Sequence, residues 1–344
     1  MNKILYPYIF LFFIVLVCVV YMSFFYKKQD KINFPIDLVY LWVDGNDEEW
    51  LKKKNYWQEK LMVTEKYSTS AARFRDRGEL KHSLRSVDKY MPWIRYIFIV
   101  TDNQIPEWLN LNNPKIKIID HKQILPQDAL PVFNSMAIET GIANIEGLAE
   151  HFIYSNDDVF VNKKISPDFF FTEEGVPVFY DDISAKKNRK KWAEENPGAM
   201  WVKLDKRVES LLQSKKMKYH NLTDTHTMSS FRKSDFLNTL RFFKEEFNKT
   251  AHSKFRDPEN VNLSIIYEVL YNQKKIAFKD SQLINSKFED GPAGILVIKN
   301  IEDIVKLKPC LFCLNDDSSL SQQDIKVHIN FLKKKYPKKS CFEK

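Results

Sequence analysis

Two stretches decide the fold: residues 36–45 read IDLVYLWVDG, and residues 151–158 read HFIYSNDD. Each is a run of β-branched, aliphatic and aromatic residues about as long as one buried strand, and each ends in an acidic turn. Between and after them, apolar runs of strand length alternate with segments of helical periodicity. This alternation is typical of an α/β protein, so the sequence predicts a sheet with helices on both faces.

The other expected elements follow the same alternation. Further strands are predicted at residues 96–101, 116–119 and 176–180. Helices are predicted at residues 47–65, 78–90, 133–144, 229–247, 260–272 and 322–336. Residues 184–218 are rich in lysine and polar side chains, and we expect them to form an exposed insertion.

An uncharged stretch near the start, residues 4–26, reads ILYPYIFLFFIVLVCVVYMSFFY. About 20 apolar residues span a bilayer as a helix. Bulky Met22, Phe24 and Phe25 stand where a cleaved signal peptide needs small residues. The sequence therefore predicts one retained transmembrane helix with a short linker over residues 1–34, followed by one large domain over residues 35–344.

The formal net charge is +8. A basic balance attracts phosphates of any kind, whether in nucleic acid, anionic lipid, nucleotide or phosphosugar. No zinc finger and no aromatic RNA-binding signature is present, so we expect no nucleic-acid partner. Walker, G-x-S-x-G and H-E-x-x-H motifs are also missing.

Acidic residues follow two of the predicted strands. Asp157 and Asp158 come after the strand at 151–155, and Asp44 with Gly45 follows Trp42 after the first strand. Ligands bind beyond the carboxyl ends of strands in such sheets. Adjacent carboxylates suit Mg²⁺ or Mn²⁺ together with substrate phosphate oxygens. The alternative is an ordinary turn, which Asn, Asp and Gly also favour.

Cationic and polar candidates lie in other segments. Arg73, Arg75, Arg77 and Arg85 gather around one helix start, and Arg256 stands in KFRD. Arginine forks match phosphate oxygens, but the same residues also form surface ion pairs. His226 in TDTHTMSSF is a candidate general base or a packed histidine. A second acidic stretch contains Asn315 and Asp316.

Taken together, these segments resemble the Stealth family. That family includes bacterial capsular polysaccharide phosphotransferases and the catalytic subunit of the lysosomal-enzyme N-acetylglucosamine-1-phosphotransferase. Four blocks match in order, at residues 36–47, 73–158, 226–271 and 309–343. The second is the longest and contains RFRDRGELKHSLRSVDKYMPWIRYIFIVTDNQIPEWL, LPVFNSMAIET and FIYSNDDVFV.

The resemblance implies a glycosyltransferase-like, Rossmann-like catalytic domain and a divalent-metal-dependent reaction. A glycan hydroxyl would receive a sugar 1-phosphate from a UDP-sugar such as UDP-N-acetylglucosamine, and UMP would be released. By motif position, the metal ligands would be Asp157 and Asp158, and the catalytic residues His226, Arg256 and Asp316. The substrate-binding residues would be Trp42, Asp44, Gly45, Arg75, Arg85, Asn134 and Asn315.

Two alternatives stay open: a conventional glycosyltransferase that releases UDP, and a non-catalytic, membrane-anchored carbohydrate-binding protein. Sidedness is also open. Lysines after the apolar stretch favour a cytosolic domain and therefore a bacterial inner membrane. Sequons at Asn221, Asn248 and Asn262 fit a lumenal one. We expect a single-pass Golgi protein with a lumenal catalytic domain.

Overall fold

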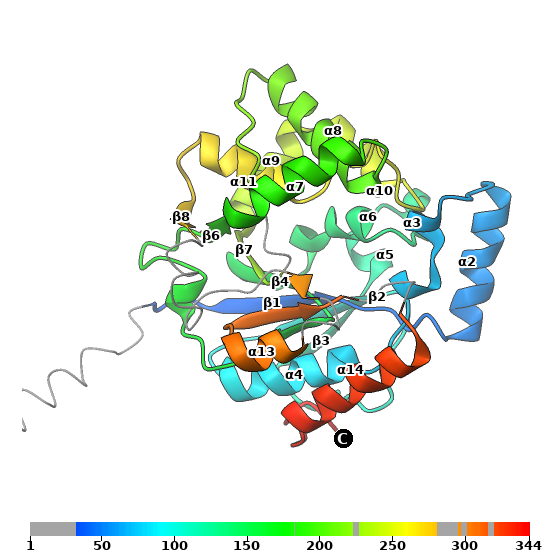
Figure 1. The fold of residues 1–344 in the computed structure, drawn as a ribbon, viewed down its shortest axis with the longest axis vertical. Coiled ribbons are helices and arrows are strands. Elements are labelled where there is room, and N and C mark those ends of the chain that lie inside the picture. The colour runs from blue at the N-terminus through cyan, green and yellow to red at the C-terminus, as the bar shows by residue number, and fades with distance from the viewer. Residues whose placement is uncertain (1–31, 182, 223–226, 281–294, 297–300, 316–319) are drawn as a thin grey trace, which may run out of the picture. The chain divides into compact units, whose positions relative to one another are not determined.

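Five strands form the central sheet, in the order β3-β2-β1-β4-β7 (Figure 1). They are β1 (Ile36–Leu41), β2 (Ile97–Thr101), β3 (Ile116–Asp120), β4 (His151–Asn156) and β7 (Ser229–Arg232). The first four are mutually parallel, and β7 runs antiparallel to β4 at the edge. The carboxyl ends of β1 to β4 therefore meet at one edge of the sheet.

The structure is a computed structural model, and it describes residues 32–181, 183–222, 227–280, 295–296, 301–315 and 320–344. Two small sheets accompany the main one. One contains β5 (Val159–Val161), β10 (Leu311–Leu314) and β9 (Ile295–Leu296), and the other pairs β6 (Val178–Asp181) with β8 (Ala277–Asp280). Because β5 follows β4 after a two-residue turn, the small sheet begins at the carboxyl edge of the large one.

The helices fill the connections. They are α2 (Glu48–Lys60), α3 (Lys66–Thr69), α4 (Glu79–Tyr90), α5 (His121–Ile124), α6 (Ser135–Glu139), α7 (Ile183–Glu195), α8 (Met200–Ser214), α9 (Lys233–Phe242), α10 (Lys244–Ala251), α11 (Ser264–Asn272), α13 (Ile301–Leu307) and α14 (Gln322–Lys335). Short 3₁₀ turns occupy Ala71–Arg73, Gln127–Ala129, Ile142–Asn144 and Pro167–Phe169.

Helices cover both faces of the sheet, as the sequence predicts. Val39, Phe152 and Phe231 point to one face and share a buried cluster with α8, α9, α10 and α11. Side chains alternate along a strand, so Tyr40 points to the other face, where its hydroxyl lies 2.7 Å from Ser83 Oγ of α4. Figure 1 shows the same division, with α4 and α14 on the opposite side of the sheet from α8 and α9.

The prediction of a preceding transmembrane helix is corrected. Among the described residues, no helix has the length and apolar character needed to cross a bilayer. The stretch on which the prediction rested, residues 4–26, lies outside the described residues. The single-pass assignment is therefore withdrawn, for the Golgi membrane and for the bacterial inner membrane alike.

Some local predictions are also wrong, and two short strands were not predicted. Residues 229–232 form β7 rather than the start of a helix, because their backbone pairs with β4. Strands β5 and β10 went unpredicted, since each contains only three or four residues. The lysine-rich stretch 184–218 contains two helices, and α8 is anchored by Val208, Leu211 and Leu212 in the main core.

Candidate functional site

The two predicted acidic turns lie side by side at the carboxyl edge of the sheet. Leu41, at the end of β1, is the register partner of Asn156, at the end of β4. Asp157 and Asp158 follow as the turn between β4 and β5, while Trp42 and Asp44 follow β1. Strand register thus brings together two segments that are more than a hundred residues apart in the sequence.

Two further carboxylates reach this edge from the start of α4. Trp42 Nε1 donates to Asp76 Oδ2 at 3.3 Å, and the Gly78 amide donates to Asp76 Oδ1 at 2.7 Å. Gly78 adopts a left-handed backbone with φ of 89°, which favours glycine at this helix start. Buried Glu79 accepts a 2.7 Å bond from Arg77 Nε.

Negative charge is concentrated at this point. Burial, together with the charges of Asp158, Glu79 and Asp76, raises the pKa of Asp157 well above its ordinary value. Burial also raises the pKa of Asp76, and the charge of Asp44 raises it further. Hydrogen bonds from Gly78 and Trp42 lower it, but the net shift is upward. Like charges that are kept out of water raise one another's pKa in this way, and a bound cation would relieve their repulsion.

The donor set fits a divalent cation that is completed by substrate. Within the described residues, no group of three or more His, Cys, Asp or Glu side chains is arranged to hold a metal ion. Mg²⁺ commonly takes one or two carboxylates and fills its other positions with water and substrate phosphate oxygens. Asp157 and Asp158 are the residues that would hold it.

The loop after β1 is fixed by its neighbours. Gln104 accepts from the Asp44 amide at 2.9 Å and donates to the Asp44 carbonyl at 3.0 Å. The Gly45 amide donates to the Phe74 carbonyl at 2.7 Å, and a Cβ added at Gly45 would lie 2.1 Å from that oxygen. Glycine is required here because the two backbones approach so closely.

Gly45→Ala should therefore displace the loop that presents Asp44. We expect this clash to lower the free energy of unfolding by about 2 kcal/mol. We also expect a loss of transfer activity that is larger than the unfolded fraction explains. Melting curves and initial rates below the melting range separate the two effects. Gly198→Ala is the matched control, since nothing lies within 4 Å of a Cβ at that glycine. Wild-type activity in a stable Gly45→Ala variant would contradict the role of this loop.

Arg256 is held in place by residues from two other segments. Its Nη2 donates to Ser135 Oγ at 2.9 Å, and its carbonyl accepts from Ser68 Oγ at 2.7 Å. The guanidinium lies over the Tyr67 ring, 5.4 Å from the centroid. These contacts join the 253–260 loop to the starts of α3 and α6.

Tyr154 connects Arg256 with the acidic turn. Its hydroxyl donates to Glu139 Oε1 and Asn156 Oδ1, each at 3.0 Å. Burial and the neighbouring Glu139 raise the pKa of Tyr154, Arg256 acts to lower it, and Asp157 raises it further. The phenol therefore lies within electrostatic range of both Arg256 and Asp157.

Asn134 has a positioning role in the structure. Its side chain is fully buried, and its Nδ2 donates to the carbonyls of Ser253 and Phe255 and to Asn260 Oδ1 at 2.9–3.2 Å. Its Oδ1 caps α6 by accepting from the Met136 amide. These contacts use its hydrogen-bonding capacity, so Asn134 ties α6 to the Arg256 loop, and we leave it out of the proposed substrate-binding set.

The fourth predicted block reaches the acidic turn through β10. The Leu314 amide donates to the Asp158 carbonyl at 3.0 Å, so Asn315 follows beside the turn. Half-buried Arg75 is the neighbour of Asp76 in the stretch before α4. His226 and Asp316, both predicted to be catalytic, lie outside the described residues.

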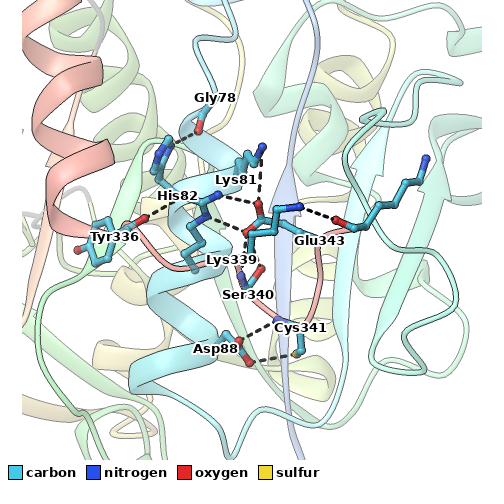
Figure 2. Close-up of polar contacts among 11 residues, drawn as sticks. Gly78, Lys81, His82, Asp88, Tyr336, Lys339, Ser340, Cys341 and Glu343 are labelled. Carbon is cyan, nitrogen blue, oxygen red and sulfur yellow. Dashed lines mark hydrogen bonds and ion pairs between the residues drawn. The ribbon is translucent and has the colours of Figure 1, made fainter.

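Arg85 belongs to a different contact. Its Nε and Nη2 donate to the two carboxylate oxygens of Glu343 at 2.8 Å, and its Nη1 donates to the Tyr336 carbonyl at 2.8 Å. Figure 2 shows the C-terminal segment lying along α4, with Glu343 beside Lys81 and with Cys341 bound to Asp88. The guanidinium is thus occupied by the protein itself, and we leave Arg85 out of the substrate-binding set.

Arg85→Ala should lower the free energy of unfolding by about 3 kcal/mol and leave the transfer rate unchanged. The reason is that it removes the arginine that pairs with the buried Glu343 carboxylate. Burial alone would raise the pKa of Glu343, but hydrogen bonds from Arg85 and Ser340 lower it to about 2, from an ordinary 4.5. The contact therefore stabilises the fold above pH 4.5, and this stabilisation is lost as the pH falls toward 2. Denaturant titrations from pH 7 to 3 should show this slope in wild type and a flatter one in Glu343→Gln. Equal slopes would contradict it.

Sequence reasoning missed the site roles of Asp76, Glu79 and Tyr154. Asp76 and Glu79 stand among arginines in RFRDRGEL, a local pattern that is also typical of surface ion pairs. The sequence does not show that these two carboxylates are buried at the start of a helix. The only local sign of that helix start is the glycine between them, Gly78. Tyr154 was counted as part of a strand, and nothing in its spacing indicates that its hydroxyl meets Glu139.

The fold and site together define an α/β protein with a carboxylate-rich centre at the carboxyl edge of its sheet. Residues 34–62 match the family model described as Stealth protein CR1, conserved region 1, and residues 73–179 match Stealth protein CR2, conserved region 2. The acidic turn, Asp76, Glu79 and Tyr154 all lie within the second match.

Curated relatives extend the likeness over most of the chain. An exopolysaccharide phosphotransferase, cps2G of Lactiplantibacillus plantarum, is 35% identical over 340 residues, covering 90% of this chain and 97% of the relative. A capsular polysaccharide phosphotransferase, fcs1 of Haemophilus influenzae, is 35% identical, and the match covers 83% of this chain and 79% of that relative. The capsular polysaccharide phosphotransferase SacB of Neisseria meningitidis serogroup A is 33% identical, and the match covers 92% of this chain and 58% of that relative. The chain therefore belongs to the Stealth family of capsular and exopolysaccharide phosphotransferases.

A solved structure of galactosyltransferase LgtC in complex with donor and acceptor sugar analogs is also similar. It has a TM-score of 0.42 and 11% sequence identity, covering 88% of this chain and 95% of that one. The assignment to the Stealth family rests on the family models and the curated relatives, and the predicted resemblance is confirmed by them.

Proposed function

We propose that this protein transfers a sugar 1-phosphate from a UDP-sugar to a hydroxyl of a glycan, releasing UMP. The observation that carries the proposal is the convergence of the Asp157–Asp158 turn with Asp44, Asp76 and Glu79 at the carboxyl edge of the sheet. The charges of Arg256 and Asp157 both act on the phenol of Tyr154, which supports placing Arg256 in the same site. Membership of a family whose curated relatives are named polysaccharide phosphotransferases supports the same reaction.

The acceptor hydroxyl attacks the β-phosphorus of the donor, which carries the sugar. A new oxygen–phosphorus bond forms, the bond to the UMP oxygen breaks, and the hydroxyl proton passes to a general base, for which we propose His226. Arg256 stabilises the charge that develops on the phosphoryl oxygens. Mg²⁺ or Mn²⁺, held by Asp157 and Asp158, would neutralise the diphosphate when bound.

The substrate contacts are assigned from position. Trp42, Asp44 and Gly45 line the first strand end, while Arg75 and Asn315 flank the acidic centre. Asp316, next in the chain, is proposed as a further catalytic residue. The catalytic domain would extend over residues 35–344.

The released nucleotide tests the proposal. The full chain is incubated with Mg²⁺, candidate UDP-sugars and glycan acceptors, and the products are separated by ion-exchange chromatography. UMP appearing together with a phosphodiester-linked sugar is the expected result. UDP would instead identify a conventional glycosyltransferase, and the absence of any acceptor-dependent nucleotide would support a carbohydrate-binding protein without catalysis.

A further inference from the structure

Two arginines share one aromatic ring beside the proposed site. The Arg73 guanidinium lies over the Tyr67 ring, 4.2 Å from its centroid, and the Arg256 guanidinium lies 5.4 Å from the same centroid. A guanidinium over a tyrosine ring is held by cation–π attraction and by stacking. Tyr67 therefore brings together two cationic side chains that come from distant parts of the sequence.

The ring itself is held by the fold. Tyr67 belongs to α3, and its amide donates at 3.1 Å to the side chain of Glu65, which caps that helix. The ring packs against a buried cluster of Met136, Met200 and Leu204. Figure 1 shows α3 beside α6, the helix that contains Met136. Tyr67 is thus a fixed support for the two guanidinium groups.

Arg73 stands in a segment that contacts two parts of the proposed site. Before Arg73, Ser68 Oγ donates to the Arg256 carbonyl at 2.7 Å. After it, the carbonyl of Phe74 accepts from the Gly45 amide at 2.7 Å. The segment therefore runs from the proposed catalytic arginine to the loop that follows β1, and Arg73 is the residue next to the contact with that loop.

Two guanidinium groups near one ring suit a ligand with several negative charges. Guanidinium forks match phosphate oxygens bidentately, and two like charges repel each other less when an anion binds between them. The donor of the proposed reaction carries a diphosphate, and Arg256 is proposed to stabilise its transferred phosphoryl group. A second arginine on the same ring would bind a further oxygen of that group.

We propose that Arg73 is a further substrate-binding residue, which binds the β-phosphoryl group of the donor together with Arg256. Tyr67 is the positioning residue for this pair, since it acts through the two guanidinium groups. The inference rests on the proposed function, because that function supplies the diphosphate. It extends the set of substrate contacts to α3 and to the 3₁₀ turn that ends at Arg73.

Binding of UDP and UMP, measured by isothermal titration calorimetry with Mg²⁺, tests the proposal without relying on turnover. Arg73→Gln should raise the Kd for UDP about tenfold, because a charge-assisted contact to the β-phosphate is lost. The Kd for UMP, which lacks that phosphate, should stay within about twofold of wild type. Arg73→Lys keeps the charge but not the planar fork, so it should raise the Kd for UDP about threefold.

The role of the ring is tested by two substitutions of Tyr67. Tyr67→Leu should raise the Kd for UDP about fivefold, because the cation–π support of both arginines is lost. Tyr67→Phe keeps the ring and should bind UDP as wild type does. Melting curves establish that each variant is folded at the temperature of the titration, so a general loss of stability is separated from a loss of binding.

Two matched controls should keep the wild-type Kd for both nucleotides. Arg241→Gln removes a guanidinium from α9, where Arg241 has an exposed contact with Asn238. Tyr96→Leu removes a ring that lies under another guanidinium, that of Arg95, just before the start of β2 and so at the opposite edge of the sheet from the acidic turn.

An unchanged Kd for UDP in both Arg73 variants, or an equal loss of affinity for UDP and UMP, would overturn the assignment of Arg73. Equal Kd values for UDP in Tyr67→Phe and Tyr67→Leu would overturn the role of the ring. The release of UMP in the transfer assay tests the proposed function separately, so the failure of one is distinguishable from the failure of the other.

Discussion

Asp158→Ala should lower sugar-1-phosphate transfer by at least about a thousandfold while the protein stays folded. The Asp158 side chain belongs to the turn between β4 and β5, and its charge contributes to the raised pKa of Asp157. Its removal takes away one of the two carboxylates that would hold a cation against the donor diphosphate. It also relieves repulsion within the carboxylate cluster, so the melting temperature without metal should not fall.

Rates of nucleotide release and melting curves with and without Mg²⁺ measure both consequences. Wild type should gain thermal stability from Mg²⁺ plus a UDP-sugar, since a ligand that binds only the folded state stabilises it, and the variant should lose that gain. Asp128→Ala is the control, because Asp128 is an exposed carboxylate paired with His252. Unchanged turnover in Asp158→Ala would remove the metal assignment.

Arg256→Ala should reduce kcat by about a thousandfold, with a smaller effect on KM for the donor. The guanidinium is positioned by Ser135 and Tyr67, and its charge acts on the same Tyr154 phenol as the charge of Asp157. An interaction made mainly in the transition state lowers kcat when it is lost. Arg256→Lys should remain poor, since a lysine cannot reproduce the planar fork.

Steady-state kinetics on the variant, with and without added guanidinium, provide the measurement. Partial rescue by millimolar guanidinium would separate a missing charge from a distorted loop. Arg241→Ala is the matched control, as Arg241 lies on α9 with an exposed contact to Asn238. A rise in donor KM at constant kcat would reassign Arg256 to ground-state binding.

The sequence predicts the long strands and the acidic turns because those depend on local patterns. The apolar runs at 36–41 and 151–156 carry the sheet, and the turns follow at their ends. The short strand β7 escapes prediction because Ser229–Arg232 reads SSFR, which has no strand periodicity, and its identity depends on pairing with β4.

Arg85 and Asn134 show what sequence alone does not resolve. An arginine near a phosphate-binding segment has the same local pattern whether it meets a substrate or a carboxylate of its own chain. Only the tertiary fold places Glu343 against Arg85, across more than 250 residues. Asn134 likewise reads as a polar site residue until three acceptors from the 253–260 loop are found around its amide.

In the proposed reaction, carboxylates at the ends of β1 and β4 and Arg256 from a distant loop would surround the donor diphosphate, and a divalent cation would neutralise its charge. The most direct measurement is a crystal structure with Mn²⁺ and a non-hydrolysable UDP-sugar phosphonate, with the manganese located by anomalous scattering. We expect one peak bonded to Asp157 or Asp158 and to diphosphate oxygens at about 2.1 Å, with the Arg256 guanidinium on the β-phosphonate. Manganese and diphosphate bound away from the β4–β5 turn would contradict the account.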